Sequence, residues 1–496
     1  MNKLEKKEFF IILFGIILNL FFANHDLKKY DIIYTDYKGS SYNQMLGSDL
    51  IDTWEFAAQI KDQLKNNNNY LDAIPAYERF YLPAIIVGFY YHILNKEIYG
   101  SYKENNNEKI ILVDNSKSGL LIFQILLYYF SIILFYTAYK NKFNPKYNLI
   151  LLIFICFEPT ITQWHYSFWS ESIFISLMFF VFYILIASPT NIIINFFVGI
   201  IVAIMFAQRA IAFLYILPII FYYLIYFKEN LKPLLFLVVG YCFVISFIIF
   251  NNHDKSGAYY LISSKHQFYS YYHYFASRIY ADTNSITGDK SEKILNAEET
   301  RWRLENNIPL DLENKINFSS NSDAFNKEES YADELLKNIK YRNQKFLEIV
   351  LDNPLYVAQF FIKRVALMCN FSPTWVKQSY ENDKTHPQAI SNPEIYYNRN
   401  LVRNLIYTLL MMLFIGMGLI RYLRDIFKSK KLLKYDKFLL FHISSVLYFI
   451  LISGLWGNPK YFTPCILSLS IFFAKGLFEF IFIFKIRAKT KLKPKI

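Results

Sequence analysis

Long apolar segments separated by short basic patches constrain this chain more than any other feature of its sequence. Hydrophobic residues make up 54% of the 496 residues. Many runs of Ile, Leu, Phe and Tyr approach the roughly 20 residues that a helix needs to cross a bilayer. A backbone in lipid must satisfy its own hydrogen bonds, which a helix does within one segment. The sequence therefore predicts an all-α polytopic membrane protein.

Ten segments are apolar and long enough to be predicted as membrane spans. They cover residues 9–23, 119–139, 147–163, 168–187, 192–208, 210–227, 233–250, 401–420, 438–455 and 460–484. Two further segments are predicted to lie at the membrane surface as amphipathic juxtamembrane helices. The stretch at 81–94 is apolar but short, and the stretch at 354–371 carries Lys363 and Arg364 in its middle.

Basic residues set the predicted orientation. The net charge is +13, and the basic residues flank apolar segments. Their position indicates the orientation of the chain in the membrane and does not favour nucleic-acid binding. With ten spans, the basic patches fall on one side, predicted to be cytoplasmic, together with both termini. Residues 9–23 are predicted to be an uncleaved first helix, since no small-residue cleavage site follows them. Two long polar segments, 24–118 and 251–400, then face the outside of the cytoplasmic membrane.

The chain divides into three predicted parts. Residues 1–250 form a transmembrane catalytic module that includes the outer loop 24–118. Residues 251–400 form an extracytoplasmic segment with interfacial helices, and residues 401–496 supply the last spans and a basic cytoplasmic tail. The four cysteines lie far apart without a CxxC pair, so they predict neither a disulfide framework nor a zinc site. No P-loop, HExxH, GxSxG or GxGxxG motif is present.

Ionisable residues collect at the predicted outer ends of the spans. Glu171 stands in ITQWHYSFWSESIFISLMFF close to His165, and Arg209 lies at an outer turn between two spans. A carboxylate near hydrocarbon depth normally faces a wet cavity, a cation or a donor, whereas a carboxylate at a helix end is also satisfied by solvent. Arg209 and Lys460 are either interfacial anchors or ligands for a phosphate.

The first outer segment contains a pair of carboxylates. In GSDLIDTWEFAAQIKDQL, Asp49 and Asp52 lie one helical turn apart and share a face. Such a carboxylate either stabilises a helix N-terminus or takes a proton from an acceptor hydroxyl or amide. The two carboxylate sites and the two cations all map to one side of the membrane. A reaction on a lipid phosphate requires that arrangement.

The order of these elements resembles the GT-C class of membrane glycosyltransferases. This class uses polyprenyl-phosphate sugars and includes protein O-mannosyltransferases and the lipid A aminoarabinose transferase. Its catalytic Asp follows the first span with Ala eight positions later, as Asp49 precedes Ala57, and an Arg then Pro follows, as in ERFYLP with Arg79. Thr53 replaces the usual aromatic residue after the Asp, but Asp52 has Phe56 at that spacing.

Further motifs follow in the same order. They comprise a span that opens with Gln, then Pro and a later Ser-Glu pair, then an Arg within a long apolar stretch, matched by Gln124, Pro159, Glu171 and Arg209. The last motif, Arg-Tyr followed by Pro, is matched by KYFTP with Lys460 and Tyr461. Lys460 keeps the positive charge of the family arginine but lacks its two-pronged hydrogen-bonding group.

The resemblance implies an integral membrane glycosyltransferase that moves a sugar from a polyprenyl-phosphate donor to a lipid, glycan or protein acceptor. Asp49 or Asp52 would act as base, while Arg209, Lys460 and Arg79 bind the donor phosphate with Tyr461 nearby. Glu171, with His165, either orients the acceptor or, together with Asp49, holds a divalent metal ion. The alternative from another class is a transporter or lipid flippase, which would place charges along a path through the membrane. A polysaccharide polymerase or ligase and a non-catalytic scaffold are further alternatives.

Overall fold

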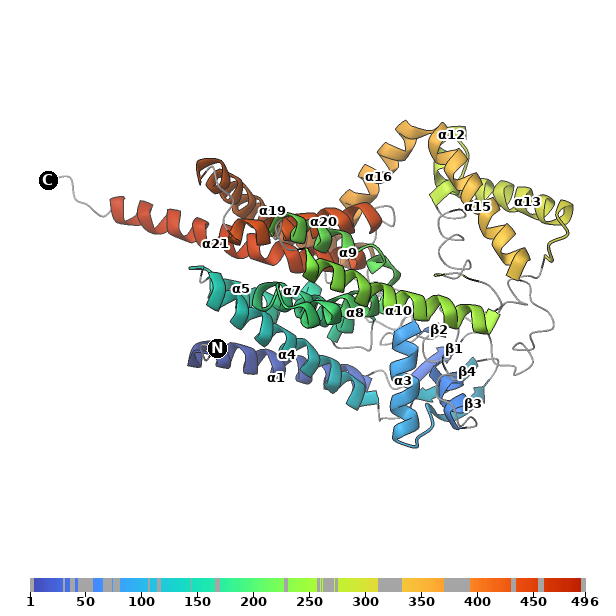
Figure 1. Ribbon diagram of the computed structural model, residues 1–496, viewed down its shortest axis with the longest axis horizontal. Coiled ribbons are helices and arrows are strands. Elements are labelled where there is room, and N and C mark those ends of the chain that lie inside the picture. Colours follow the sequence, from blue (N-terminus) through green and yellow to red (C-terminus); the bar gives the residue numbers. More distant parts are fainter. Residues whose placement is uncertain are drawn as a thin grey trace.

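The computed structural model describes the chain in segments. These are residues 4–29, 32–35, 41–42, 57–65, 74, 81–105, 108–113, 117–143, 145–165, 170–226, 231–256, 259, 261, 272, 275–310, 332–369, 393–429, 434–453 and 459–491. Most of them are helical. Apolar helices run side by side along the long axis of the molecule, and α12, α13 and α15 lie beyond one end of them (Figure 1).

Seven of the described helices are long and apolar enough to cross a membrane, as judged by length and composition. They are α1 (Lys6–Lys29), α4 (Lys117–Phe143), α7 (Ser170–Ala187), α10 (Lys232–Ser256), α19 (Pro393–Ser429), α20 (Lys434–Ser453) and α21 (Thr463–Lys491). They match seven of the ten predicted spans. The length and composition of these helices are those of a multi-pass membrane protein. The other three predicted spans form shorter apolar helices.

Prolines and polar residues explain two of these shorter helices. The predicted span at 147–163 stops as α5 (Asn148–Phe157) because Glu158 is extended and Pro159 starts the one-turn helix α6 (Pro159–Thr162), followed by η1 (Gln163–His165). Pro218 lies in the first turn of α9 (Ile216–Tyr226), after the short helix η2 (Ala210–Ala212), where its missing N–H is tolerated. The third, α8 (Ile192–Gln208), has 17 residues and begins at the cap Asn191, whose side chain accepts from Ile194 N.

The first outer segment contains a sheet that the all-α prediction did not include. Strands β1 (Ile32–Thr35), β2 (Ser41–Tyr42), β3 (Tyr99–Asn105) and β4 (Glu108–Val113) form an antiparallel sheet in the order β2-β1-β4-β3. β1 follows α1 and β4 precedes α4, and the two strands pair with Ile32 opposite Leu112. The sheet therefore closes this segment at the end of the bundle where α4 begins.

Two apolar segments predicted to lie at the membrane surface are helical. The first is α3 (Tyr81–Ile93), which crosses the direction of α1 and α4 near the sheet (Figure 1). The second is α16 (Pro354–Met368), which follows α15 (Ala332–Asp352). Together with α12 (Ser277–Asn284) and α13 (Gly288–Glu305), these last helices make an outer helical group with its own small core of Tyr272, Phe275, Ile279, Leu295, Ile349 and Phe360.

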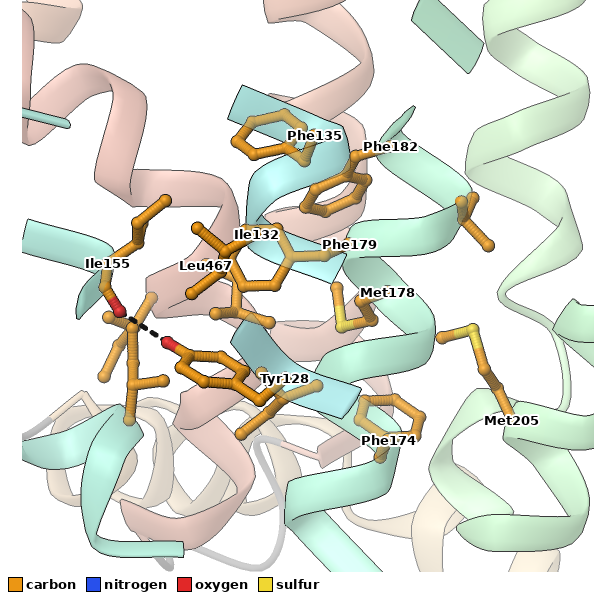
Figure 2. Packing of buried hydrophobic residues seen from close by; sticks show 14 of the residues in the cluster. Tyr128, Ile132, Phe135, Ile155, Phe174, Met178, Phe179, Phe182, Met205 and Leu467 are labelled. Carbon is orange, nitrogen blue, oxygen red and sulfur yellow. Dashed lines mark hydrogen bonds between the residues drawn. The ribbon is translucent and has the colours of Figure 1, made fainter. Parts of the chain in front are cut away.

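The main core lies between α4, α7 and their neighbours. Figure 2 shows aromatic and aliphatic side chains of α4 and α7 interleaved, with Met205 of α8 and Leu467 of α21 beside them. Tyr128 is buried there and donates its hydroxyl to the carbonyl oxygen of Ile155 at 2.5 Å. Because lipid is as apolar as these side chains, close packing and such hydrogen bonds hold the helices together.

Charged pairs fix the end of the bundle that is predicted to be cytoplasmic. Lys140 at the end of α4 donates to Glu8 at 2.7 Å and to Glu5 at 2.8 Å, and Tyr136 also donates to Glu8. Lys475 of α21 donates to Asp425 of α19 at 2.9 Å. These contacts tie the beginning of α1 to the end of α4, and α19 to α21.

Candidate functional site

Helix ends meet at the end of the bundle opposite these charged pairs. Gln124, near the start of α4, donates to the carbonyl oxygen of His165 at 3.1 Å, just before α7 begins. Lys142, at the other end of α4, donates to the carbonyl oxygen of Ile186 at the end of α7. The two helices therefore run in the same direction. The start of α7 therefore lies at the same end of the bundle as the four-stranded sheet.

An ion pair joins the start of α7 to the end of α8. Arg209 Nη1 contacts Glu171 Oε1, and the two residues are only 9% and 2% exposed. Ser170 donates its hydroxyl to Glu171 Oε2 at 3.0 Å, so both carboxylate oxygens have a partner. The sequence predicted both residues as site members at the outer end of the spans. Their direct pairing is a finding of the structure.

The backbone at Arg209 explains how its side chain reaches Glu171. Arg209 is the C-cap of α8, with φ −151° and ψ 122°, and its N–H bonds to Met205 O at 2.8 Å. The helix ends at this extended residue, and the short helix η2 follows directly. The extended cap thereby points the guanidinium out of the helical spiral and towards α7.

The guanidinium also lies over an aromatic ring from the far end of the sequence. Tyr461 belongs to η7 (Pro459–Phe462), the turn that leads into α21, and Arg209 Cζ is 5.2 Å from its ring centroid. An arginine over a tyrosine face is attracted by the ring quadrupole, more strongly when water is excluded. Of the eight predicted site residues, Glu171, Arg209 and Tyr461 are thus brought into contact.

Hydrogen bonds fix the backbone around the ion pair. Gln208 donates its side-chain amide to the carbonyl oxygen of Ser170 at 2.9 Å, which locks the last residue of α8 to the first turn of α7. Trp164 donates its indole N–H to the hydroxyl of Thr463 at 3.1 Å, which locks η1 to the start of α21. Sequence reasoning did not select Gln208, although it directly precedes Arg209.

His165 lies in the same buried region. Its Nδ1 is 2.7 Å from Ser172 Oγ, one residue after Glu171, and its ring centroid is 4.0 Å from that of Tyr128. Within the described part of the chain, His165 Nε2 and Gln208 Oε1 are buried atoms without a hydrogen-bond partner. A buried polar atom that lacks a partner costs free energy unless water or a ligand satisfies it.

A second buried carboxylate was not predicted as a site residue. Glu158 accepts from Thr160 Oγ1 at 2.7 Å, from Ile161 N at 2.9 Å and from the hydroxyl of Tyr407 at 3.1 Å. The first two contacts cap the short helix α6, and the third ties it to α19. A glutamate directly before proline in an apolar run is the signal for this cap.

The remaining predicted site residues are not placed by the structure. Asp49, Asp52 and Arg79 lie outside the described residues. The backbone of Lys460 belongs to η7, but its side chain is likewise outside the description. The roles of these four residues stay predictions.

Of the two residues of the predicted metal site, the structure describes only Glu171. Among the described residues, no three His, Cys, Asp or Glu side chains gather where they could hold an ion. Both oxygens of Glu171 are engaged by Arg209 and Ser170. The predicted pairing of Glu171 with Asp49 around a metal ion stays untested because Asp49 lies outside the described residues.

Comparisons of the chain with protein-family models, with curated proteins and with solved structures yield no match. The resemblance to GT-C glycosyltransferases therefore stays a prediction from the motifs.

Proposed function

We propose that this protein is a membrane glycosyltransferase that transfers a sugar from a polyprenyl-phosphate donor to a lipid, glycan or protein acceptor. The observation that carries the proposal is the buried ion pair of Glu171 and Arg209, with Tyr461 against the guanidinium. A charged pair between apolar helices costs desolvation free energy, so a protein retains one mainly where it serves a purpose.

Arg209 is the proposed ligand of the donor phosphate. A guanidinium has five N–H donors in a planar fork that matches two phosphate oxygens, so it can bind phosphate while it keeps a bond to a carboxylate. Glu171 neutralises Arg209 inside the apolar bundle. When the donor binds, its phosphate takes over part of that neutralisation.

The proposed reaction is a single displacement. Asp49 or Asp52 removes the proton of the acceptor hydroxyl or amide, and the freed electron pair attacks the anomeric carbon. The bond from that carbon to the phosphate oxygen breaks, and polyprenyl phosphate leaves with the electron pair. Arg209, assisted by Lys460 and Arg79, stabilises the negative charge that develops on the leaving phosphate. One attack of this kind inverts the anomeric centre.

Buried polar atoms beside the ion pair suit an acceptor or a sugar. His165 Nε2 and Gln208 Oε1 lack partners among the described residues, and both residues bond to the first turn of α7. Each could pair with a hydroxyl group, since a neutral imidazole nitrogen and an amide oxygen accept hydrogen bonds. We assign His165 and Glu171 to the orientation of the acceptor.

The proposed location is the outer face of the cytoplasmic membrane. The ion pair lies at the end of the bundle opposite Lys140, Lys475 and the other basic residues that the positive-inside rule assigns to the cytoplasm. The same end carries the sheet and the outer helical group, which are built from the two long polar segments.

The test is a donor panel with purified full-length protein. Wild type, Asp49→Asn, Asp52→Asn and the double variant are incubated with polyprenyl-phosphate sugars, with and without acceptor extracts. Release of free polyprenyl phosphate is followed by mass spectrometry. We expect release that needs both an acceptor and one of the two aspartates. Release that is unchanged in the double variant shows that the base is wrongly assigned. No release from any donor by folded protein overturns the proposal in favour of transport or scaffolding.

A further inference from the structure

Helices α15 and α16 form an elbow that connects the outer helical group to the bundle. Asn353 joins them, with φ −129° and ψ 50°, and its side chain donates to the carbonyl oxygen of Ile349 at 2.8 Å. Pro354 starts α16, which sets the direction of the second arm because proline cannot continue α15.

One face of the elbow is covered. Ile349 of α15 and Phe360 of α16 are buried in the small core of the outer helical group, where Phe360 meets Phe275 with ring centroids 6.3 Å apart. This packing holds both arms of the elbow against α12.

The opposite face is apolar and open. Leu351, Leu355 and Ile362 are 73%, 67% and 67% exposed, and Leu347 extends the series one turn earlier on α15. On α15 the residues are spaced by four, and on α16 Leu355 and Ile362 are spaced by seven, so each series follows one side of its helix. We call these four residues the elbow stripe. A stripe of this kind marks a contact with a partner or a membrane.

The C-terminal end of α16 lies level with the ends of the apolar helices, where η7 leads into α21. Met368, its last residue, is fully buried in the main core together with residues of the spans, and α16 contacts η7, which leads directly into α21. Figure 1 shows α16 descending from the outer helical group to the ends of α20 and α21. A bilayer that surrounds the apolar helices would therefore have its outer surface beside α16.

The charge of α16 favours an anionic surface. Lys363 and Arg364 stand next to Ile362, and the helix PLYVAQFFIKRVALM contains no acidic residue. Lys363 is exposed, and Arg364 Cζ lies 4.9 Å from the ring centroid of Phe360. Basic residues beside an apolar helix face bind the phosphate headgroups of a membrane while the apolar side chains enter the acyl boundary.

We infer that the elbow stripe is a membrane-docking surface, which rests in the outer leaflet with anionic phospholipid headgroups around Lys363 and Arg364. This inference does not rest on the proposed sugar transfer. It gives the outer helical group a second attachment to the membrane besides the spans, and that attachment lies next to η7, which carries Tyr461.

The experiment uses full-length protein in nanodiscs. Cys242, the exposed native cysteine, is replaced by Ser, and an environment-sensitive fluorophore is attached at Leu355→Cys or Ile362→Cys. Asn306→Cys on the exposed end of α13 is the matched control. Lipids with a quencher near the headgroup are then added. We expect blue-shifted emission and loss of most of the signal at 355 and 362, with little change at 306.

Charge is tested separately. In nanodiscs with phosphatidylglycerol the quenching at 362 should exceed that in phosphatidylcholine alone, and Lys363→Gln with Arg364→Gln should remove the difference. If the fluorophore at 355 or 362 emits as it does in water and is not quenched by the labelled lipids, the inference is overturned. Shielded emission without lipid quenching, together with cross-links between copies, would assign the stripe to a second copy and also overturns it. Equal quenching in both lipids refutes the anionic preference.

Discussion

Glu171 and Arg209 form an ion pair that links the first turn of α7 to the residue that ends α8, inside a bundle of apolar helices. Gln208 fastens the same two helix ends through the carbonyl oxygen of Ser170. The pair is therefore both a structural joint and the proposed phosphate site. Its two roles predict different behaviour for single and double variants.

Replacing Arg209 by Gln should destabilise the protein by about 3–5 kcal/mol, because Glu171 is left as a buried charge without its cation. The double variant Glu171→Gln with Arg209→Gln should recover most of this loss, since a buried neutral pair lacks the desolvation cost of a lone ion. Thermal unfolding in detergent measures both. Equal losses in the single and double variants would contradict the pairing.

Gly418 of α19 and Gly476 of α21 allow these helices to touch. A Cβ at Gly418 would lie 1.9 Å from Phe472 O, and a Cβ at Gly476 would lie 1.8 Å from Phe414 O. Gly418→Ala should therefore force the helices apart and cost about 1–3 kcal/mol. Gly416→Ala, two residues away with no atom within 4 Å of its added Cβ, is the control. It should be neutral or stabilising by up to about 1 kcal/mol. Matching unfolding midpoints for both variants would refute this packing.

Glu97, which lies outside the spans, should make the stability of the folded protein depend on pH. Lys61 donates to it at 2.5 Å, and this hydrogen bond holds the pKa of Glu97 below its ordinary value of 4.5. Because the folded pKa is the lower one, the contribution of the pair is present above pH 4.5 and is lost as the pH falls through the folded pKa. Since Glu97 is exposed, the contribution should stay below about 1 kcal/mol.

The measurement compares unfolding midpoints of wild type and Glu97→Gln from pH 7 to pH 3. The difference should be present at neutral pH and vanish in acid. Glu305→Gln, an exposed carboxylate on α13, serves as control. A difference that persists unchanged at pH 3 would exclude the titration of Glu97 as its source.

His442 separates the transport alternative from the proposed function. It is fully buried within α20, with ring centroids 4.5 Å from Phe438 and 4.7 Å from Phe182, and neither ring nitrogen has a hydrogen-bond partner among the described residues. His442→Phe should therefore fold normally. Transfer activity should be retained as well. Loss of function in a well-folded variant would instead favour a charge path through the membrane.

Asn195→Leu provides the contrast for His442. Asn195 is equally buried but donates to Pro189 O at 3.0 Å and to Asn191 O at 2.7 Å, and it accepts from Tyr223. Its loss leaves these groups unpaired and should cost about 1–3 kcal/mol.

Local patterns predicted much of this fold. Apolar length identified the helices that could span a membrane, and the short stretch at 81–94 is a separate helix, α3. The stop at Glu158 and Pro159 could have been recognised because proline begins helices and interrupts them. The sheet could not be recognised, because β1 pairs with β4 across most of the first outer segment and its strands are short.

The candidate site was predicted in its parts but not in its contacts. The bounds of the apolar segments placed Glu171 and Arg209 at one end of the predicted spans, since charges avoid the bilayer centre. Their pairing depends on how α7 packs beside α8 and on the extended backbone at Arg209. Tyr461 reaches the guanidinium of Arg209 from a turn that lies 252 positions later in the sequence. Spacing within one segment carries no information on such a contact.

Binding of polyprenyl phosphate to the full-length protein in nanodiscs tests the proposed phosphate site most directly. Wild type is compared with the Glu171→Gln and Arg209→Gln double variant. Arg421→Gln on α19, which removes an arginine beside Asp425 of α19 and Glu479 of α21, is the control. Loss of a charged hydrogen-bond donor should weaken binding by roughly 10- to 100-fold in the double variant, with the control unchanged. Wild-type affinity in a folded double variant would contradict the assignment of Arg209 to the donor phosphate.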